Sequence, residues 1–185
     1  MGWNVINVNE KNADKALELI NKMYQKRKDL LAAFLSEHKD EVDNLPQVLK
    51  VRMAALKEVN PKRFNDSPEL PLSTLAAVEL IKKFPDGPDG VTAEDVDNAH
   101  KKYNLERGDD VGPFLVTHIY LSYLEDVKSG AISRDGKIID IEKSQVMQTH
   151  HDSKSYGLPN EAKEIMAKFK KTTNIHKNTR GIEME

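Results

Sequence analysis

Residues 114–127 read FLVTHIYLSYLEDV, the most apolar segment of the chain. Large apolar side chains recur there in steps of three and four, which is the period of an α-helix that is buried on more than one side. A Gly-Pro pair precedes the segment, and proline is tolerated in the first turn of a helix. We therefore expect a central helix over residues 114–128.

Upstream of this segment, residues 73–84 read STLAAVELIKKF and leave little polar surface, so they predict a second core helix. Downstream, short apolar stretches flank an Asp-Gly dipeptide between residues 131 and 141, a pattern that favours a β-hairpin. The predicted fold class is all-α: a single-domain irregular helical bundle, with a short hairpin near 131–141 as its only β element.

The N-terminal third predicts two further helices. Apolar side chains alternate in steps of three and four from residue 12 to residue 38, at Leu17, Ile20, Tyr24, Leu31 and Phe34. A second helical pattern covers residues 44–59, and the short charged link favours an antiparallel helical hairpin over 12–59. We expect the apolar stripe of its first helix to pack on neighbouring helices.

Two connections complete the predicted domain. Three prolines in residues 60–72 predict an extended crossover, because proline lacks the backbone donor that a helix or a sheet needs. Thr92 and Asp95 form a capping-box pattern that starts a short, mostly polar helix, expected on the surface. The helical domain is expected to span residues 1–171, followed by a flexible polar tail at 172–185.

The composition excludes several classes of protein. The 185 residues carry a net charge of −2, which gives no global attraction to nucleic acid or to an anionic membrane. The absence of cysteine excludes thiolate nucleophiles and sulfur-based zinc sites. No apolar run is long enough to predict a membrane span, so we expect a soluble chain.

Two Asp-Gly loops resemble the calcium-binding loop of EF-hand proteins. Such a loop has oxygen ligands at positions one, three, five and twelve and glycine at position six. With Gly136 at the sixth position, Ala131 stands where the first ligand belongs. Around Gly90 the spacing fails, because Pro85 and Gly87 occupy the first and third positions. We interpret both loops as tight turns; a degenerate EF-hand-like helix-loop-helix pair remains an alternative.

The run THHDSKSYG, residues 149–157, contains His150, His151 and Asp152. Its adjacent His-Asp pair resembles the metal-binding dipeptide of some phosphohydrolases, which take further ligands from separate helices. His100 and His118 are the candidates for that role. A divalent-metal-dependent hydrolase is therefore an alternative function, although the run also suits a polar loop that binds no metal.

Histidine and tyrosine also occur inside the central helix. A lone histidine in an apolar helix, such as His118, is most often a hydrogen-bonded core residue. Tyr120 and Tyr123 are expected to be core aromatics with their hydroxyls at the edge of the core.

Charge is unevenly distributed along the chain. Acidic residues dominate between positions 86 and 110, and basic residues dominate between 163 and 180. These regions suit partners of opposite charge, or each other, although solvated helix faces have the same composition. The predicted partner-binding residues are Lys168, Lys170, Lys171, Lys177 and Arg180.

The sequence favours a binding protein over an enzyme. It lacks a nucleophile elbow, a Walker loop, a Rossmann glycine pattern and a His-Glu-x-x-His motif. We predict a non-enzymatic helical module for protein–protein interaction or regulation, without a cofactor. The missing cysteine, the lysine- and asparagine-rich composition and the polar tail resemble bacterial effectors with a C-terminal secretion signal. That resemblance implies secretion without an N-terminal signal peptide, as an alternative to a cytoplasmic location.

Overall fold

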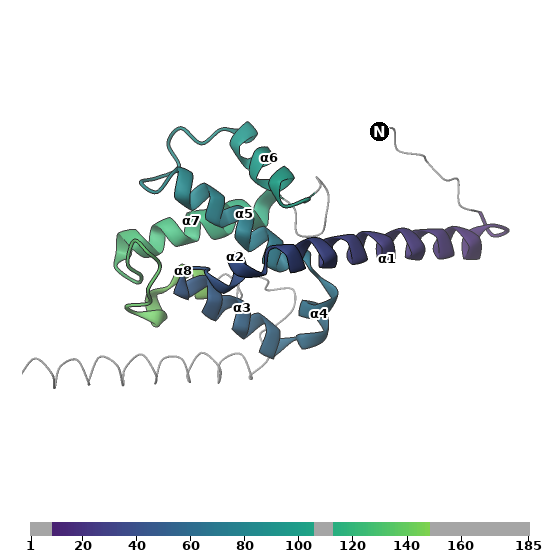
Figure 1. Cartoon of the computed structure of the whole chain (residues 1–185), viewed down its shortest axis with the longest axis horizontal. Coiled ribbons are helices and arrows are strands. Elements are labelled where there is room, and N and C mark those ends of the chain that lie inside the picture. The colour runs from purple at the N-terminus through teal and green to yellow at the C-terminus, as the bar shows by residue number, and fades with distance from the viewer. Residues whose placement is uncertain (1–8, 106–112, 149–185) are drawn as a thin grey trace, which may run out of the picture.

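The structure, a computed structural model, describes residues 9–105 and 113–148 of the chain (Figure 1). Within these ranges the fold is all-α and contains no strand, which confirms the predicted fold class. The helices are α1 (Ala13–Glu37), α2 (Lys39–Asp43), α3 (Gln47–Val59), α4 (Pro61–Asp66), α5 (Glu69–Lys83), α6 (Ala93–Lys102), α7 (Pro113–Ser129) and α8 (Gln145–Gln148), with a 3-10 turn η1 (Ile141–Lys143) before α8.

Helices α5 and α7 form the centre of the core, as their apolar sequences predict. They pack against each other, α6 lies against both, and α8 packs on α7. From Pro71 to Val78 every side chain of α5 is buried, and Val116, Ile119 and Tyr120 of α7 are no more than 1% exposed. No helix in the described ranges has both the length and the apolar content needed to cross a bilayer.

The predicted extended crossover at 60–72 is wrong, because most of this segment is helical. Pro61 occupies the first turn of α4, where the Asn60 side chain caps the helix by accepting from the Arg63 amide at 3.0 Å. Pro71 similarly lies in the first turn of α5. A helix makes no use of its first backbone donors, so proline costs little at these positions.

The predicted hairpin over 12–59 does not form as two helices packed side by side. The short helix α2 intervenes, and α3 packs mainly on α4 and α8, whereas α1 makes its main contacts with α2 and α5. Figure 1 shows α1 as a long, straight helix whose N-terminal part projects from the rest of the molecule. The sequence pattern therefore predicted that two helices form, but it did not predict which helices they pack against.

The hairpin expected near 131–141 is reduced to a tight turn with one antiparallel bridge, between Ile132 and Ile138. Gly136 closes the turn with φ +83°, a left-handed conformation that glycine adopts without strain. The turn is held against the start of α3, where the Val48 amide donates to the Gly136 carbonyl at 3.0 Å. The Gln47 side chain accepts from the amide of Ile138 at 2.8 Å. These contacts take up backbone groups that a longer hairpin would pair internally.

A buried carboxylate fixes the segment after this turn. Asp126 on α7 is completely buried and accepts hydrogen bonds from the Ser144 hydroxyl at 2.6 Å and from the amides of Gln145 and Val146 at 2.5 and 3.2 Å. Burial raises the pKa of Asp126 above its usual value, although the three donors act in the opposite direction. Asp126 thereby ties the start of α8 to α7.

Candidate interaction surface

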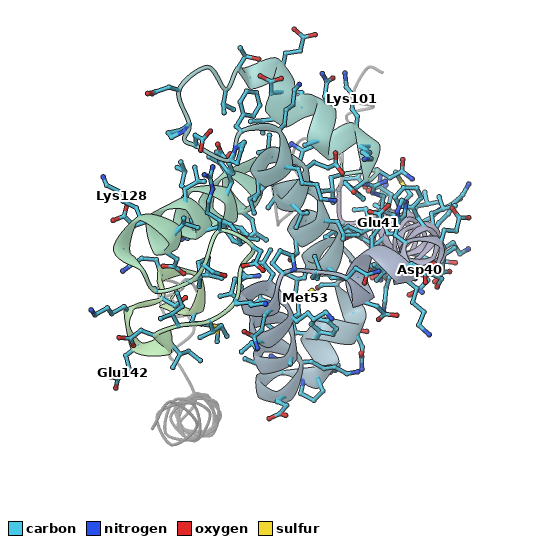
Figure 2. The ribbon with its side chains drawn as sticks, turned by 60° about the vertical axis from the view of Figure 1, so that its left-hand side comes forward. Asp40, Glu41, Met53, Lys101, Lys128 and Glu142 are labelled. Carbon is cyan, nitrogen blue, oxygen red and sulfur yellow. The ribbon has the colours of Figure 1, made fainter. Side chains whose placement is uncertain are left out.

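The most unusual surface of the described chain lies on the N-terminal half of α1. Five large apolar side chains are exposed on this half, and we call them the projecting stripe: Leu17 (56% exposed), Leu19 (46%), Ile20 (38%), Met23 (69%) and Tyr24 (71%). Ala16, which lies between them on the helix, is buried. Figure 2 views α1 nearly end on, beside the labelled Asp40 and Glu41, with its side chains fanning outward at one edge of the molecule.

Most of the same face of α1 is covered in its C-terminal half, although Leu30 is 59% exposed. Leu31 is 1% exposed, and Phe34 and Leu35 are half-buried against the core. Polar contacts fix this half: the Arg27 guanidinium donates to the Asn104 carbonyl at 2.6 Å, and Lys28 Nζ lies 2.7 Å from Asp66 Oδ1. We call the described part of the molecule after α1, from α2 to α8, the body. Leu17, Ile20 and Tyr24 continue the spacing of Leu31 and Phe34, so the projecting stripe faces the side of α1 on which the body lies.

The stripe runs into a groove at the base of the projection. The groove has a volume of about 560 Å³ and lies between the middle of α1 and the end of α6. Its described lining includes the apolar side chains of Leu30, Phe34 and Leu105, together with Arg27 and Lys101. The stripe and the groove thus follow one another along α1.

The segment that carries the stripe is mostly positive in charge. Residues 14–28 contain the basic residues Lys15, Lys22, Lys26, Arg27 and Lys28, against the acids Asp14 and Glu18. Glu18 and Lys22 pair with each other across one helical turn at 2.8 Å, and both are well exposed. An exposed pair of this kind contributes little to stability. The lysines and acids therefore bear more on the choice of partner than on the fold.

A second cluster of titratable groups joins α2, α5 and α6 and is structural in character. The buried Tyr103 hydroxyl donates to Glu41 Oε2 at 2.8 Å and to Glu79 Oε1 at 3.2 Å, and Lys102 pairs with Glu79 at 2.7 Å. Burial and the two carboxylates raise the pKa of Tyr103, so its phenol remains a proton donor. Burial also raises the pKa of Glu41, but hydrogen bonds with Tyr103 and His38 outweigh this and leave it below its usual value. The groups satisfy one another's hydrogen bonds.

The two Asp-Gly loops are tight turns, as predicted, and both are anchored on α7. The Tyr120 hydroxyl donates to the carbonyls of Phe84 and Gly87 at 2.8 and 2.9 Å, and the Tyr123 hydroxyl donates to the Arg134 carbonyl at 2.9 Å. The two tyrosines are core aromatics with edge hydroxyls, which confirms their prediction. Burial, with a smaller contribution from the charge of Asp135, raises the pKa of Tyr123 to about 12.

An ion pair between Arg134 and Asp86 links the two loops at the surface. The oxygen side chains of the second loop are used within the turn, because Asp135 accepts from the Ser133 hydroxyl and Asp140 from the Glu142 amide. Within residues 9–105 and 113–148, no group of three or more acidic or histidine side chains is placed to hold a metal ion. The geometry of the loops is that of ordinary turns.

The two histidines considered in the sequence lie in different environments. His118 is exposed on α7, so its prediction as a core residue is wrong: the helix buries Ile119 and Tyr120 and turns His118 outward. His100 is buried on α6, in a helix whose capping box at Thr92 and Asp95 forms as expected. Because His100, like Ala99 and Tyr103, faces the core, α6 is only partly a surface helix.

Other predicted site residues lie outside the part of the chain that the structure describes. These are the metal candidates His150, His151 and Asp152, the basic residues Lys168, Lys170, Lys171, Lys177 and Arg180, and the polar tail 172–185. They stay predictions.

Sequence reasoning identified the apolar stripe of α1 but not its exposure. The predicted helix lengths could have indicated this exposure. The helix expected over 12–38 is longer than the helices expected at 44–59 and 73–84, so neither of these two helices can cover its apolar stripe from end to end. Comparison with protein-family models, with curated proteins and with solved structures found no match to this chain.

Proposed function

We propose that this protein is a non-enzymatic interaction module that binds a helix of a protein partner through the projecting stripe of α1. The observation that carries the proposal is the exposure of five large apolar side chains on one face of a projecting helix. Exposed apolar patches rimmed by polar residues are typical of interaction sites. An amphipathic helix laid against such a face is a common mode of protein recognition.

The position of the stripe favours a protein over a lipid surface. The stripe faces the same side of α1 as Leu31, which is buried against the body. A flat bilayer that touched the stripe would therefore meet the body first. A helix is only about 10 Å wide, so it can approach the stripe where a flat surface cannot.

The basic residues Lys168, Lys170, Lys171, Lys177 and Arg180 remain a proposed second contact for an acidic region of the partner. Secretion as an effector is likewise compatible with the proposal.

Site-specific photo-crosslinking tests the proposal. Tyr24, in the stripe, is replaced by a photo-crosslinking phenylalanine derivative, and the same residue is placed at Glu18, on the opposite face of the helix, as the matched control. We expect covalent protein adducts in cells from position 24 and at least tenfold fewer from position 18. Equal yields at the two positions, or no adduct at position 24, would contradict the proposal.

A further inference from the structure

We propose that the helix received by the projecting stripe is the α1 helix of a second copy of this chain, lying antiparallel to the first. This inference rests on the proposed function and names its partner. The pairing is centred near Asn21 and joins residues 14–28 of the two copies, a stretch of 15 residues or about 22 Å. The interface is thus a short two-stranded coiled coil between two bodies.

The shape of the molecule permits only the antiparallel arrangement. The body contacts α1 at Arg27 and Lys28 and covers it at Leu31, whereas the five apolar side chains of the stripe are exposed on the part that projects in Figure 1. In an antiparallel pair, the two bodies lie at opposite ends of the paired stretch. A parallel pair would bring both bodies to the same end, on the inner side of the helices, where they would overlap.

The apolar spacing also fits two strands. Leu17, Ile20, Tyr24 and Arg27 occupy successive core positions of a heptad pattern. In the antiparallel register, Ile20 faces Tyr24 of the partner subunit, and Leu17 lies at the level of Arg27 of the partner subunit, whose guanidinium is held by Asn104 of its own chain. In a parallel register, the two Arg27 side chains would lie at the same level, and two like charges would approach each other.

Charge complementarity supports the same register. Asp14, Asn21 and Lys28 follow one another at seven-residue intervals along one edge of the stripe. In the antiparallel register the flanking positions of the two helices pair with a small offset from the core layers, which brings Asp14 of each copy against Lys28 of the partner subunit and gives two ion pairs with an Asn21 amide pair between them. On the other edge, Met23 meets Met23 of the partner subunit. Parallel pairing would instead place Lys28 beside Met23, without a compensating charge.

The groove at the base of the projection extends the contact. In this register the first turn of the second α1 reaches the mouth of the groove, beside Leu30. Two heptads alone bury less than the ~1,200 Å² that is usual for stable complexes, so we expect a weak dimer whose population rises with concentration. Lys28, which contacts Asp66 in its own chain, remains near enough to the edge to share its charge with the partner's Asp14.

Cysteine cross-linking tests the register, because the chain contains no cysteine of its own. The variants Asp14→Cys and Lys28→Cys are prepared separately and treated with a short bismaleimide, alone and as a mixture. We expect at least tenfold more cross-linked dimer in the mixture than in either variant alone, because only the antiparallel pair joins position 14 to position 28. Equal yields in all three samples, or none in the mixture, would overturn the proposal.

A charge exchange provides a second readout by sedimentation equilibrium. Asp14→Lys and Lys28→Asp, each alone, are expected to weaken dimerisation about three- to tenfold, and the double variant is expected to restore it. Asp66→Ala serves as the control for the contact that Lys28 loses within its own chain. A wild-type protein that stays monomeric at millimolar concentration would overturn the second-copy inference.

The photo-adducts formed at position 24 separate this inference from the proposed function. An adduct with twice the mass of the chain supports both. An adduct with a different protein, and none with a second copy, overturns the inference and leaves the proposed function standing. The absence of any adduct overturns both.

Discussion

The two halves of α1 have the same apolar spacing but opposite environments. Leu31 is 1% exposed, whereas Leu17, two heptads earlier, is 56% exposed. The difference lies in the neighbours: α1 has 25 residues, but α5, against which it packs, has only 15. Hydrophobic periodicity therefore shows which face of a helix is apolar, whereas the lengths of neighbouring helices decide how much of that face is covered.

The largest expected effect separates these two leucines directly. Leu31→Ala should lower the free energy of unfolding by about 2–5 kcal/mol, because it removes buried methyl groups and leaves a cavity. Leu17→Ala should change it by no more than about 0.5 kcal/mol, because that side chain is mostly exposed. Urea unfolding followed by circular dichroism, at a protein concentration low enough to avoid association, measures both. An equal loss in the two variants would mean that the projecting half is covered in the monomer.

The turn at Gly136 is closely packed, in contrast to the projecting half of α1. A Cβ atom at Gly136 would lie 2.4 Å from the Pro46 Cβ and 2.9 Å from the Tyr123 hydroxyl, in a backbone with φ +83°. Gly136→Ala should therefore cost about 2–4 kcal/mol, from left-handed strain and overpacking together.

Gly90→Ala is the matched control for this substitution. Gly90 has φ +89° but no atom within 4 Å of its Cβ position, so only the strain of about 1–2 kcal/mol is expected. The difference between the two variants in thermal or urea unfolding isolates the packing contribution. An equal loss of unfolding free energy in the two variants would show that Gly136 is not closely packed against Pro46 and Tyr123.

Much of the core could be predicted because its signals are local. The apolar runs at 73–84 and 114–128 lie within α5 and α7, and the Thr92–Asp95 capping box marks the start of α6. Each of these depends on side chains within a few residues of one another. Helix type and approximate position follow from such patterns without knowledge of the fold.

The features that sequence reasoning missed depend on position within an element or on distant packing. Pro61 and Pro71 looked like helix breakers, but both lie in first turns, where the missing donor is harmless. His118 shares an apolar segment with Ile119 and Tyr120, yet its position on the helix turns it outward while those two side chains are buried. For the candidate site, the sequence showed the residues of the stripe but not their exposure, because exposure depends on helices elsewhere in the chain.

The buried carboxylate of Asp126 accepts three hydrogen bonds, and it allows a comparison with an exposed carboxylate of α1. Asp126→Asn keeps the shape of the side chain but replaces one acceptor oxygen with a donor. In place of Oδ1 the new NH2 group faces the amide of Gln145, and in place of Oδ2 it faces the amide of Val146, so in either orientation one backbone donor loses its acceptor. We expect a loss of about 1–3 kcal/mol and faster hydrogen exchange in α8. The exposed Asp14→Asn on α1 is the control, expected to change stability by less than about 0.5 kcal/mol. Unchanged exchange in α8 would show that Asp126 does not fix that helix.

The smallest expected effect concerns the surface pair between α5 and α6. A hydrogen bond from Lys83 at 2.8 Å, together with the amide and hydroxyl of Thr92, lowers the pKa of Asp95 to about 2. Since the usual value is 3.8, the contribution of ionised Asp95 to stability is complete above about pH 4 and is lost as the pH falls from about 4 to about 2. Lys83→Ala should therefore raise the pKa of Asp95 in a carboxyl NMR titration, whereas Lys82→Ala, at the neighbouring exposed lysine, should leave it unchanged. A similar rise in both variants would assign the shift to the general positive charge of the end of α5. The low pKa of Asp95 would then not depend on the specific pair with Lys83.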